Sequence, residues 1–584
     1  MKSTRFRFCL FLFYLCVLCG SSFAVDRTAF TFTHYDLEVR IDPGGSAIAA
    51  RGKLRVRNDS STAQRNLTLQ ISSALTWRLI ELNGKPLQYV TDKYTTDIDH
   101  TGAVTEAVVA LPSAVPPQAS VELEVGYSGE ITQDATRLTR VGIPSEVAAH
   151  SDWDQVAEPI TAIRGIGYVA WYPVSLPAAS MSDNSLFPAL DAWKTAQQAT
   201  SMRVSLCWVG EENLTVIANG RPEGVTRHAA GAGEDATTNL GCSIYTYAPV
   251  ANTVPTFAVA EYSALARPVI NVFYLPQQAA AAQEYALAAE KVLPFETEWF
   301  GGPKTKVQVV QLAAIGDAPF ESGPLLFTPL ELTERSSIEL RMIHQLTHAS
   351  FSAARPWIEE GVAHFAQALD REQQSGRTAA LSYMKTLLPP LQAAEAGTAP
   401  APDRGSEARA KHAAPGLITS TDEVMYRVKA MYVWWMLRDM MGDAALQQAL
   451  KKYRAADDKD TAYMSHLLEQ AARRNLEWFF DDWLYRDRGL PDFRVDAVFP
   501  RVTLNGTYVV TVTVADDGQP AAEVPLFVRA EGGGERTKRV LVKGKSKAVE
   551  RIELPVAATE VWVNDGSVPE SNMNNNSFTI APAK

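Results

Sequence analysis

The stretch "MIHQLTHASFSAARPWIEEGVAHFAQAL", residues 342–369, has the spacing of two consecutive helices that carry metal-binding side chains. His344 and His348 are four residues apart, so they share one face of a helix. Pro356 can begin a second helix, because proline is favoured at the first helical position. If that helix returns antiparallel to the first, it brings Glu360 to the two histidines. Two histidines and one glutamate are a zinc ligand set that leaves one position open, so the sequence predicts a metal centre here.

The histidine pair also has an ordinary structural interpretation. The chain contains nine histidines, and two of them four residues apart are commonly surface or core residues without a metal. Ser336 and Glu339 have the spacing of a capping box, which predicts that the first helix begins there. His364 lies one helical turn after Glu360, where it would either support the metal ligands from outside or pack in the core. The glutamate on the second helix favours the metal centre.

The motifs in and around this stretch resemble those of a known peptidase family. "HQLTH…PWIEEGVAHF" is similar to the HExxH…WLxEGxA signature of the gluzincin metallopeptidases, and nearly all of the chain resembles the membrane alanyl aminopeptidase family. "APFESGPLLF" (318–327) resembles the family's GAMEN strand, and "YRVKAMYVWWMLRDMMGD" (426–443) resembles its YxKGAxVLxML helix. Further landmarks follow in the family's order in "HYDLEVRIDP" (34–43), "YVAWYPV" (168–174) and "NLEWFFDDWLYRDRGLPDFRV" (475–495).

The resemblance implies a zinc aminopeptidase whose metal is held by His344, His348 and Glu360. It implies that Glu321 holds the free amino group of a peptide and that Tyr426 stabilises the oxyanion formed during hydrolysis. Taken by themselves, Glu321 could be any acid at a strand end, and Tyr426 a core tyrosine with a satisfied hydroxyl. The expected cofactor is Zn²⁺, and the expected partners are peptide or protein N-termini.

The chain departs from the family pattern at the residue that transfers the proton. Gln345 stands where the family has the glutamate that acts as general base. A glutamine amide does not accept a proton at neutral pH, and general acid–base catalysis contributes roughly 10²–10⁴ in rate. Eleven residues separate His348 from Glu360, fewer than in the best-known aminopeptidases of the family. Phe320 and Ser322 stand where GAMEN has its methionine and asparagine. Hydrolysis is therefore expected to be reduced.

Composition and hydropathy patterns predict a multidomain α+β protein. The chain has 584 residues, of which 46 % are hydrophobic and 21 % charged, so it can form several globular cores. Alternating strand patterns through residues 25–268 predict an N-terminal β-sandwich, and the resemblance implies that it is an aminopeptidase-like β domain. Residues 269–490 show mainly helical periodicity, and the resemblance implies a thermolysin-like zinc peptidase domain there. Residues 491–584 return to strands and predict a C-terminal, immunoglobulin-like β-sandwich. Within the helical region, residues 387–416 are rich in Pro, Gly and Ala and predict a long loop.

Residues 1–24 predict a secretory signal peptide. Three basic residues precede the apolar run "CLFLFYLCVLC", and "SFA" provides small residues for cleavage. The run is too short to span a membrane, and no later stretch is long and apolar enough. Loss of those three charges takes the net charge from −11 to −14, which argues against nucleic acid and anionic membranes as partners. The protein is expected to be exported to the periplasm or the extracellular space, without a membrane span.

Two cysteines, Cys207 and Cys242, follow the predicted signal. Two cysteines in an exported protein are candidates for one disulfide bond. The alternative is a pair of buried thiols, and the sequence leaves both open.

Three functional hypotheses follow from these observations. The first is a zinc-binding aminopeptidase homologue that binds peptides but hydrolyses them poorly, because Gln345 replaces the base. The second is an active metallopeptidase with another base, although Glu359 is expected to point away from the metal and Glu321 to bind the substrate amine. The third is a non-catalytic binding or scaffold protein with a vestigial metal site. The first and second predict bound zinc, and the second adds chelator-sensitive hydrolysis.

Overall fold

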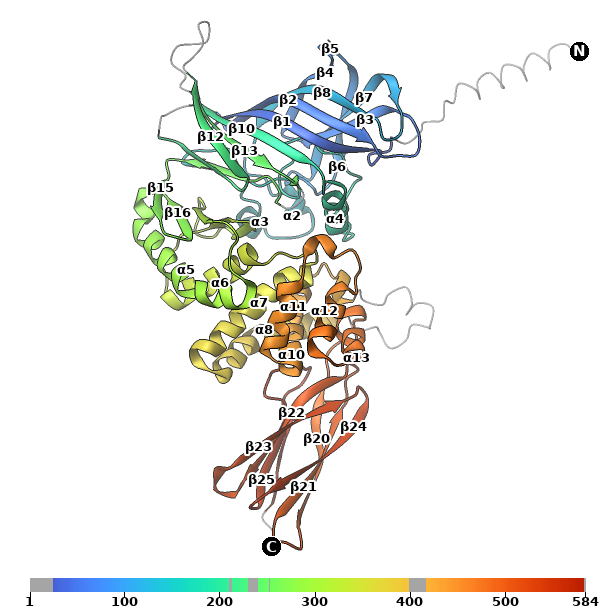
Figure 1. Ribbon diagram of the computed structural model, residues 1–584, viewed down its shortest axis with the longest axis vertical. Helices are drawn as coiled ribbons and strands as arrows, with labels where there is room; N and C mark the ends of the chain where they lie inside the picture. Colours follow the sequence, from blue (N-terminus) through green and yellow to red (C-terminus); the bar gives the residue numbers. More distant parts are fainter. Residues whose placement is uncertain (1–24, 210–212, 229–239, 251–252, 399–415, 582–584) are drawn as a thin grey trace, which may run out of the picture. The chain divides into compact units, whose positions relative to one another are not determined.

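The computed structural model describes residues 25–209, 213–228, 240–250, 253–398 and 416–581. They form a mixed α+β protein with a sheet-rich N-terminal region, a central helical region and C-terminal sheets (Figure 1). The predicted α+β class is confirmed at that level. The predicted signal lies outside the described residues. Among the described residues, no helix is both long and apolar enough to cross a membrane.

The chain divides into two compact units. The first contains the chain up to Tyr262 together with Leu312–Ala318. The second contains Ser263–Gln311 and Pro319–Lys584, so the helical region and the C-terminal sheets belong to one unit.

The first unit is built mainly from three sheets. The largest has the spatial strand order β12 (Arg221–His228), β13 (Leu240–Tyr247), β10 (Ser201–Val209), β1 (Phe30–Asp42), β2 (Ala47–Asn58), β8 (Ser120–Glu130), β4 (Leu75–Leu82) and β5 (Lys85–Pro86). The smaller sheets have the orders β3 (Gln64–Ser72), β7 (Ala103–Val115), β6 (Gln88–Thr95) and β11 (Thr215–Ala218), β14 (Phe257–Ala260), β9 (Ile160–Ile163). Three short helices accompany them: α2 (Thr136–Arg140), α3 (Ser145–Ser151) and α4 (Leu186–Ala196).

Strand β1 shows why this region forms sheets. Its residues Tyr35, Leu37, Val39 and Ile41 are buried, and the residues between them are exposed, as the alternating pattern predicts. Strand β1 pairs antiparallel with β2 and parallel with β10, so it lies in the interior of the large sheet.

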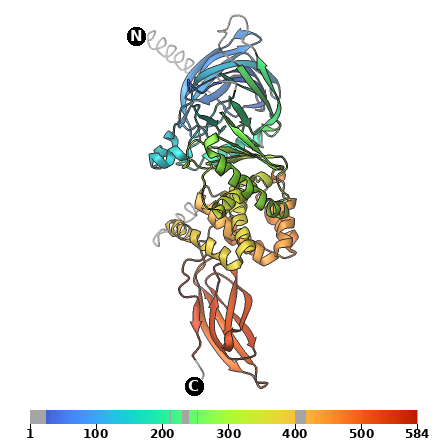
Figure 2. The same cartoon turned by 90° about the vertical axis from the view of Figure 1, so that its left-hand side faces the viewer.

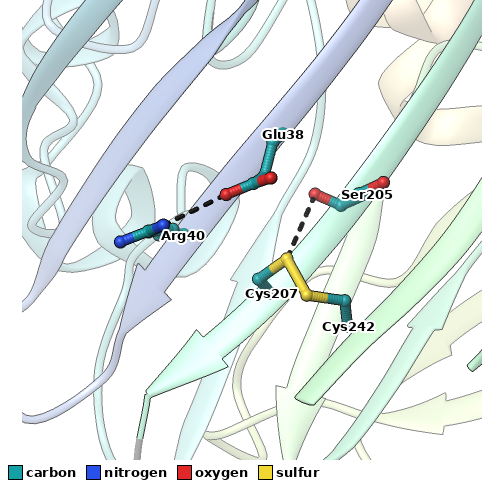
Figure 3. The surroundings of a disulfide bond; sticks show 5 residues. All are labelled: Glu38, Arg40, Ser205, Cys207 and Cys242. Atoms are coloured by element: carbon teal, nitrogen blue, oxygen red, sulfur yellow. Dashed lines mark hydrogen bonds and ion pairs between the residues drawn. A yellow bond between two sulfur atoms is a disulfide. The ribbon is translucent and has the colours of Figure 1, made fainter. Parts of the chain in front are cut away.

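A disulfide bond joins Cys207 on β10 to Cys242 on β13 (Figure 3). The two residues are direct partners in the antiparallel register of these strands, which brings their side chains together. Of the two alternatives left by the sequence, the structure therefore shows the disulfide.

The second unit begins with a five-stranded sheet that is followed by helices. The spatial strand order is β15 (Ser263–Ala266), β16 (Ile270–Tyr274), β17 (Val307–Gln311), β19 (Leu325–Thr328) and β18 (Phe320–Ser322). Strand β17 is almost entirely buried. The helices are α5 (Ala279–Phe300), α6 (Arg335–Ser350), α7 (Pro356–Ser375), α8 (Arg377–Thr398), α10 (Ala430–Met441), α11 (Asp443–Lys452), α12 (Tyr463–Ala472) and α13 (Glu477–Phe480). Two π-helical turns are η4 (Met425–Lys429) and η6 (Asp481–Tyr485), and short 3₁₀ turns are η2 (Pro276–Gln278), η3 (Leu417–Thr419), η5 (Ala455–Asp457) and η7 (Glu531–Gly533).

Helix α8 corrects the prediction of a long loop over residues 387–416. The helix continues to Thr398 through two consecutive prolines, Pro389 and Pro390. On either side of them, Leu388 and Leu391 are buried in the hydrophobic core. Packing of this apolar face outweighs the loss of two backbone donors, which a count of Pro and Gly does not register. Residues 399–415 lie outside the part of the chain that the structure describes.

Two sheets complete the second unit. One has the order β20 (Phe493–Val502), β21 (Tyr508–Asp516), β24 (Ser546–Leu554), and the other β23 (Glu535–Val542), β22 (Ala522–Ala530), β25 (Ala558–Val563), β26 (Ser577–Thr579). Figures 1 and 2 show these strands as a separate group at the C-terminal end of the chain. Buried apolar residues of β21, β22, β24 and β25 join the same hydrophobic core as the helices.

Candidate metal centre

Helices α6 and α7 carry the predicted metal ligands. Helix α7 begins at Pro356, as predicted. Helix α6 begins at Arg335, and its N-cap residue Glu334 makes no side-chain capping bond, so the predicted capping box is wrong. The carboxylate of Glu339 instead accepts a hydrogen bond from Lys291 Nζ at 2.6 Å, across to helix α5. The side chain of Glu339 is therefore engaged in a tertiary ion pair.

The three predicted ligands converge on one point. His344 Nε2 lies 3.3 Å from His348 Nε2 and 3.8 Å from Glu360 Oε2. His348 Nε2 lies 3.7 Å from Glu360 Oε1. Zinc ligands at about 2.0–2.1 Å from the ion in a tetrahedron are roughly 3.3–3.4 Å apart. The observed separations are within about half an ångström of that value, so the three side chains could hold a metal ion.

Two further side chains extend this cluster. Ligand atoms of Glu321, His344 and His348 lie within 4.8 Å of one another, and so do those of His344, Glu360 and His364. Both groups share His344. They come from strand β18 and helices α6 and α7.

Several polar atoms in this cluster are buried without a hydrogen-bond partner among the described residues. These atoms are Glu321 Oε1, His344 Nδ1, Gln345 Oε1, and both ring nitrogens of His364. Buried polar atoms are rarely unpaired in proteins, so a group of them close together is a place suited to bind an ion or another polar ligand. The donor set is imidazole and carboxylate, which suits zinc.

The histidines of the cluster have different charges. Burial, together with His348 and Arg427, lowers the pKa of His344 well below its usual value. Burial also lowers the pKa of His364 to about 3, with a further contribution from His344. Both rings are therefore neutral at pH 7, which is the form that binds metals. For His348, burial is outweighed by Glu359 and Glu360, which raise its pKa to about 9.

Glu359 supports His348 from outside the cluster, a role that the sequence analysis missed. Its Oε1 lies 3.4 Å from His348 Nδ1, and its Oε2 accepts a hydrogen bond from the backbone N–H of Ala353. Metal-ligating histidines commonly bond a carboxylate through the second ring nitrogen. Glu359 was expected to point away from the metal. Its contact is with the outer nitrogen of His348, eleven residues away in sequence, which is compatible with that expectation.

Arg427 was also missed by the sequence analysis. Its Nε donates to Glu360 Oε2 at 3.0 Å, and its Nη1 pairs with Glu423 on the same helical segment. Burial raises the pKa of Glu360, but His348 and Arg427 outweigh it and hold that pKa below its usual value. Glu360 is therefore ionised and has both an arginine and the two histidines as partners. The sequence signal for this contact was that Arg427 directly follows Tyr426, a residue already expected to lie in the site.

Gln345 points from helix α6 toward strand β19. Its Nε2 donates to the carbonyl oxygen of Phe327 at 3.2 Å, and the residue is buried. Its amide also favours the ionised form of Glu321, although burial raises the pKa of that acid overall. Gln345 thus makes contacts that depend on an amide N–H.

Tyr426 lies on the π-helical turn η4, directly before helix α10. It is partly buried, and the guanidinium of Arg427 lies 5.9 Å from the centre of its ring. At the start of this segment, the carboxylate of Asp422 accepts hydrogen bonds from the N–H groups of Val424 and Met425. Asp422 has the N-cap geometry, in which the side chain accepts from the N–H groups two and three residues further on.

Helix α10 sets the position of α7. The rings of Trp357 and Trp434 stack with their centres 5.1 Å apart, and Trp434 Nε1 donates to the carbonyl oxygen of Trp357 at 3.1 Å. Gly361 lies at this contact, where a Cβ would meet the Cβ of Ala430 at 2.6 Å. Glycine permits this close approach, and the neighbouring Glu360 is placed by it.

Comparison with known proteins adds no family assignment. No protein-family model and no curated protein matched the chain. The functional interpretation therefore depends on the residues and on their geometry.

Proposed function

We propose that this chain is an exported, zinc-binding homologue of the membrane alanyl aminopeptidases, and that it binds or acts on peptides with free N-termini. The observation that carries the proposal is the convergence of His344, His348 and Glu360, whose ligand atoms are 3.3 to 3.8 Å apart. The resemblance adds the finer fold assignments: an N-terminal β-sandwich, a thermolysin-like domain and a C-terminal immunoglobulin-like sandwich. The Cys207–Cys242 disulfide supports export, because disulfides persist mainly in oxidising compartments.

His344, His348 and Glu360 would hold the ion, and Glu359 orients His348 from behind. Zinc bound there would polarise a carbonyl group and lower the pKa of water. Glu321 is a buried acid beside these ligands, suited to receive the ammonium group of a peptide N-terminus. Tyr426 would donate its hydroxyl to the developing oxyanion.

Gln345 is the reason to propose reduced hydrolysis. It occupies the position of the general base, and its amide cannot take a proton from water. Its Nε2–H is already donated to the Phe327 carbonyl. Loss of general-base catalysis lowers the rate by roughly 10²–10⁴.

An active peptidase with a different base is the second candidate. Glu359 is engaged by His348 and by the Ala353 N–H, so it is not available as that base. Glu321 has one buried carboxylate oxygen without a hydrogen-bond partner among the described residues. It also lies beside His344 and His348, so it is the candidate for an alternative general base. It could serve as base only where it does not hold a substrate amine.

Zinc content tests the proposed function. We expect one zinc per purified wild-type chain, and its loss after His344→Ala, His348→Ala or Glu360→Ala, measured by elemental analysis. His466→Ala, at an exposed histidine on helix α12, is the matched control and should keep the zinc. Fluorogenic aminoacyl and peptide substrates should be cleaved slowly or not at all. Absence of zinc from metal-replete wild type would refute the site, and rapid chelator-sensitive cleavage would favour the second candidate.

A further inference from the structure

His364 lies on the same helix face as Glu360, because the two residues are four apart on helix α7. Both of its ring nitrogens are buried, and neither has a hydrogen-bond partner among the described residues. A neutral imidazole has one donor and one acceptor, so two chemical demands are unmet at this residue. A core histidine that only packs would be expected to satisfy at least one of them.

The side chain of His364 faces the cluster. One of its nitrogens lies within 4.8 Å of a nitrogen of His344 and of a carboxylate oxygen of Glu360. The rings of His344 and His364 have their centres 4.9 Å apart, at an interplanar angle of 68°. His344 contacts His348 in a similar way, with ring centres 4.8 Å apart. His344 is therefore flanked by an imidazole on each helix.

A supporting role outside the ligand shell fits His364 less well. Such a residue bonds the outer atom of a ligand, as Glu359 does with His348 Nδ1. The outer nitrogen of His344, Nδ1, has no partner among the described residues, so His364 does not fill that role there. On Glu360, the outer contact is made by Arg427, whose Nε donates a hydrogen bond to Glu360 Oε2.

We propose that His364 is a fourth protein ligand, which gives the metal centre three histidines and one glutamate and closes it. The inference rests on the proposed zinc site and deepens it. Hydrolytic zinc sites keep one of four positions for water or substrate, whereas sites with four protein ligands are structural. In this chain a protein side chain would occupy that fourth position. The missing base at Gln345 and the closed shell are then two independent reasons for weak hydrolysis.

The coordination shell of the wild-type protein tests this directly. X-ray absorption at the zinc edge of the full zinc-loaded chain should show three imidazoles, and the His364→Ala variant should show two. Chelator competition should give a zinc affinity for His364→Ala that is lower by more than the roughly 10–100-fold loss typical of an outer-shell partner. His466→Ala should leave both measurements unchanged. The wild-type spectrum decides the question even if His364→Ala does not fold.

A small anion reports whether a position is open. The visible spectrum of the cobalt-loaded wild-type chain should not change when azide is added, whereas that of cobalt-loaded His364→Ala should. One bound zinc with only two imidazoles, or a cobalt spectrum of wild type that responds to azide, would overturn the closed site and leave the proposed function standing. Wild type without any bound zinc would overturn both.

Discussion

Gln345 joins helix α6 to the neighbouring strand β19 through its side-chain amide. It is buried, and its Nε2–H donates to the carbonyl oxygen of Phe327. The residue therefore has a structural contact of its own at the position where the family resemblance would place a general base. A carboxylate would face the Phe327 carbonyl oxygen and lie close to Glu321, so an amide fits these contacts better than an ionised carboxylate does.

The Gln345→Glu variant should be less stable than wild type. Ionised glutamate removes the hydrogen bond from residue 345 to the Phe327 carbonyl oxygen, which costs about 0.5–1.5 kcal/mol, and it adds the cost of burying a charge. Thermal unfolding of the metal-free chain at pH 8 measures the effect. Gln448→Glu, the same change at an exposed position of helix α11, is the control and should unfold like wild type. Equal unfolding temperatures for both variants would contradict the structural role of Gln345.

At the scale of elements, the contact between α7 and α10 controls the geometry of the metal centre. The stacked pair Trp357 and Trp434 fixes the two helices against each other, and Gly361 allows their backbones to approach closely. Arg427, on the turn that precedes α10, then reaches Glu360 on α7. The third candidate ligand is thus positioned by an element more than sixty residues away in sequence.

Gly361→Ala should therefore disturb both stability and metal binding. The added methyl would meet Ala430 Cβ at 2.6 Å and Trp434 Nε1 at 3.0 Å, so the helices must move apart. Overpacking of this kind costs about 1–3 kcal/mol, more than the gain of up to about 1 kcal/mol from replacing glycine in a helix. We expect a lower urea midpoint and weaker zinc binding in chelator competition.

Gly534→Ala is the control for this substitution. A Cβ at Gly534 meets no atom within 4 Å, so neither the urea midpoint nor zinc binding should change. If Gly361→Ala binds zinc as tightly as Gly534→Ala does, then the α7–α10 contact does not position Glu360.

At the scale of the whole molecule, side chains tie the C-terminal sheets to the helical region within the second unit. Trp483 Nε1 donates to the carbonyl oxygen of Ala521 at 2.8 Å, and Arg377 Nε donates to Asp565 at 3.1 Å. Glu570 lies at the same junction, where its backbone oxygen accepts from Gln392 of helix α8. The sheets and the helices are therefore expected to unfold together.

Glu570 should make the stability of this unit depend on pH. Burial raises its pKa to about 7, while Asn564, Asn576 and the Phe493 N–H partly oppose that shift. Between the ordinary pKa of about 4.5 and pH 7, the folded chain keeps a proton that the unfolded chain has released. Stability is therefore full below that window and falls as the pH rises through it, by at most about 3 kcal/mol.

Calorimetry at pH 5 and pH 8 measures this dependence. Between pH 5 and pH 8, the unfolding temperature of wild type should fall by more than that of Glu570→Gln, because the glutamine has no proton to release. Burial also raises the pKa of Asp516 to about 6, so some dependence should remain in the variant. Glu553→Gln, at an exposed position of β24, should behave like wild type. An unchanged pH dependence in Glu570→Gln would exclude this residue as the cause.

Local patterns in the sequence predicted some features of the strands and helices, although the capping box for α6 was wrong. Period-two alternation predicted β1, and proline at the first helical position predicted the start of α7 at Pro356. The four-residue spacing of His344 and His348 placed them on one face, and the structure brings Glu360 to them. These features depend on backbone geometry over a few residues, so the spacing of residues in the sequence is enough to predict them.

Contacts between distant segments were decided only by the tertiary structure. The pairing of Cys207 with Cys242, the Gln345–Phe327 bond and the Arg427–Glu360 ion pair each join residues that no local periodicity relates. Helix α8 continued through two prolines because its apolar face was buried by other elements. The sequence by itself determined which side chains were available for a metal centre. Packing of α6, α7 and α10 decided which of them meet, because burial and partner choice depend on the whole fold.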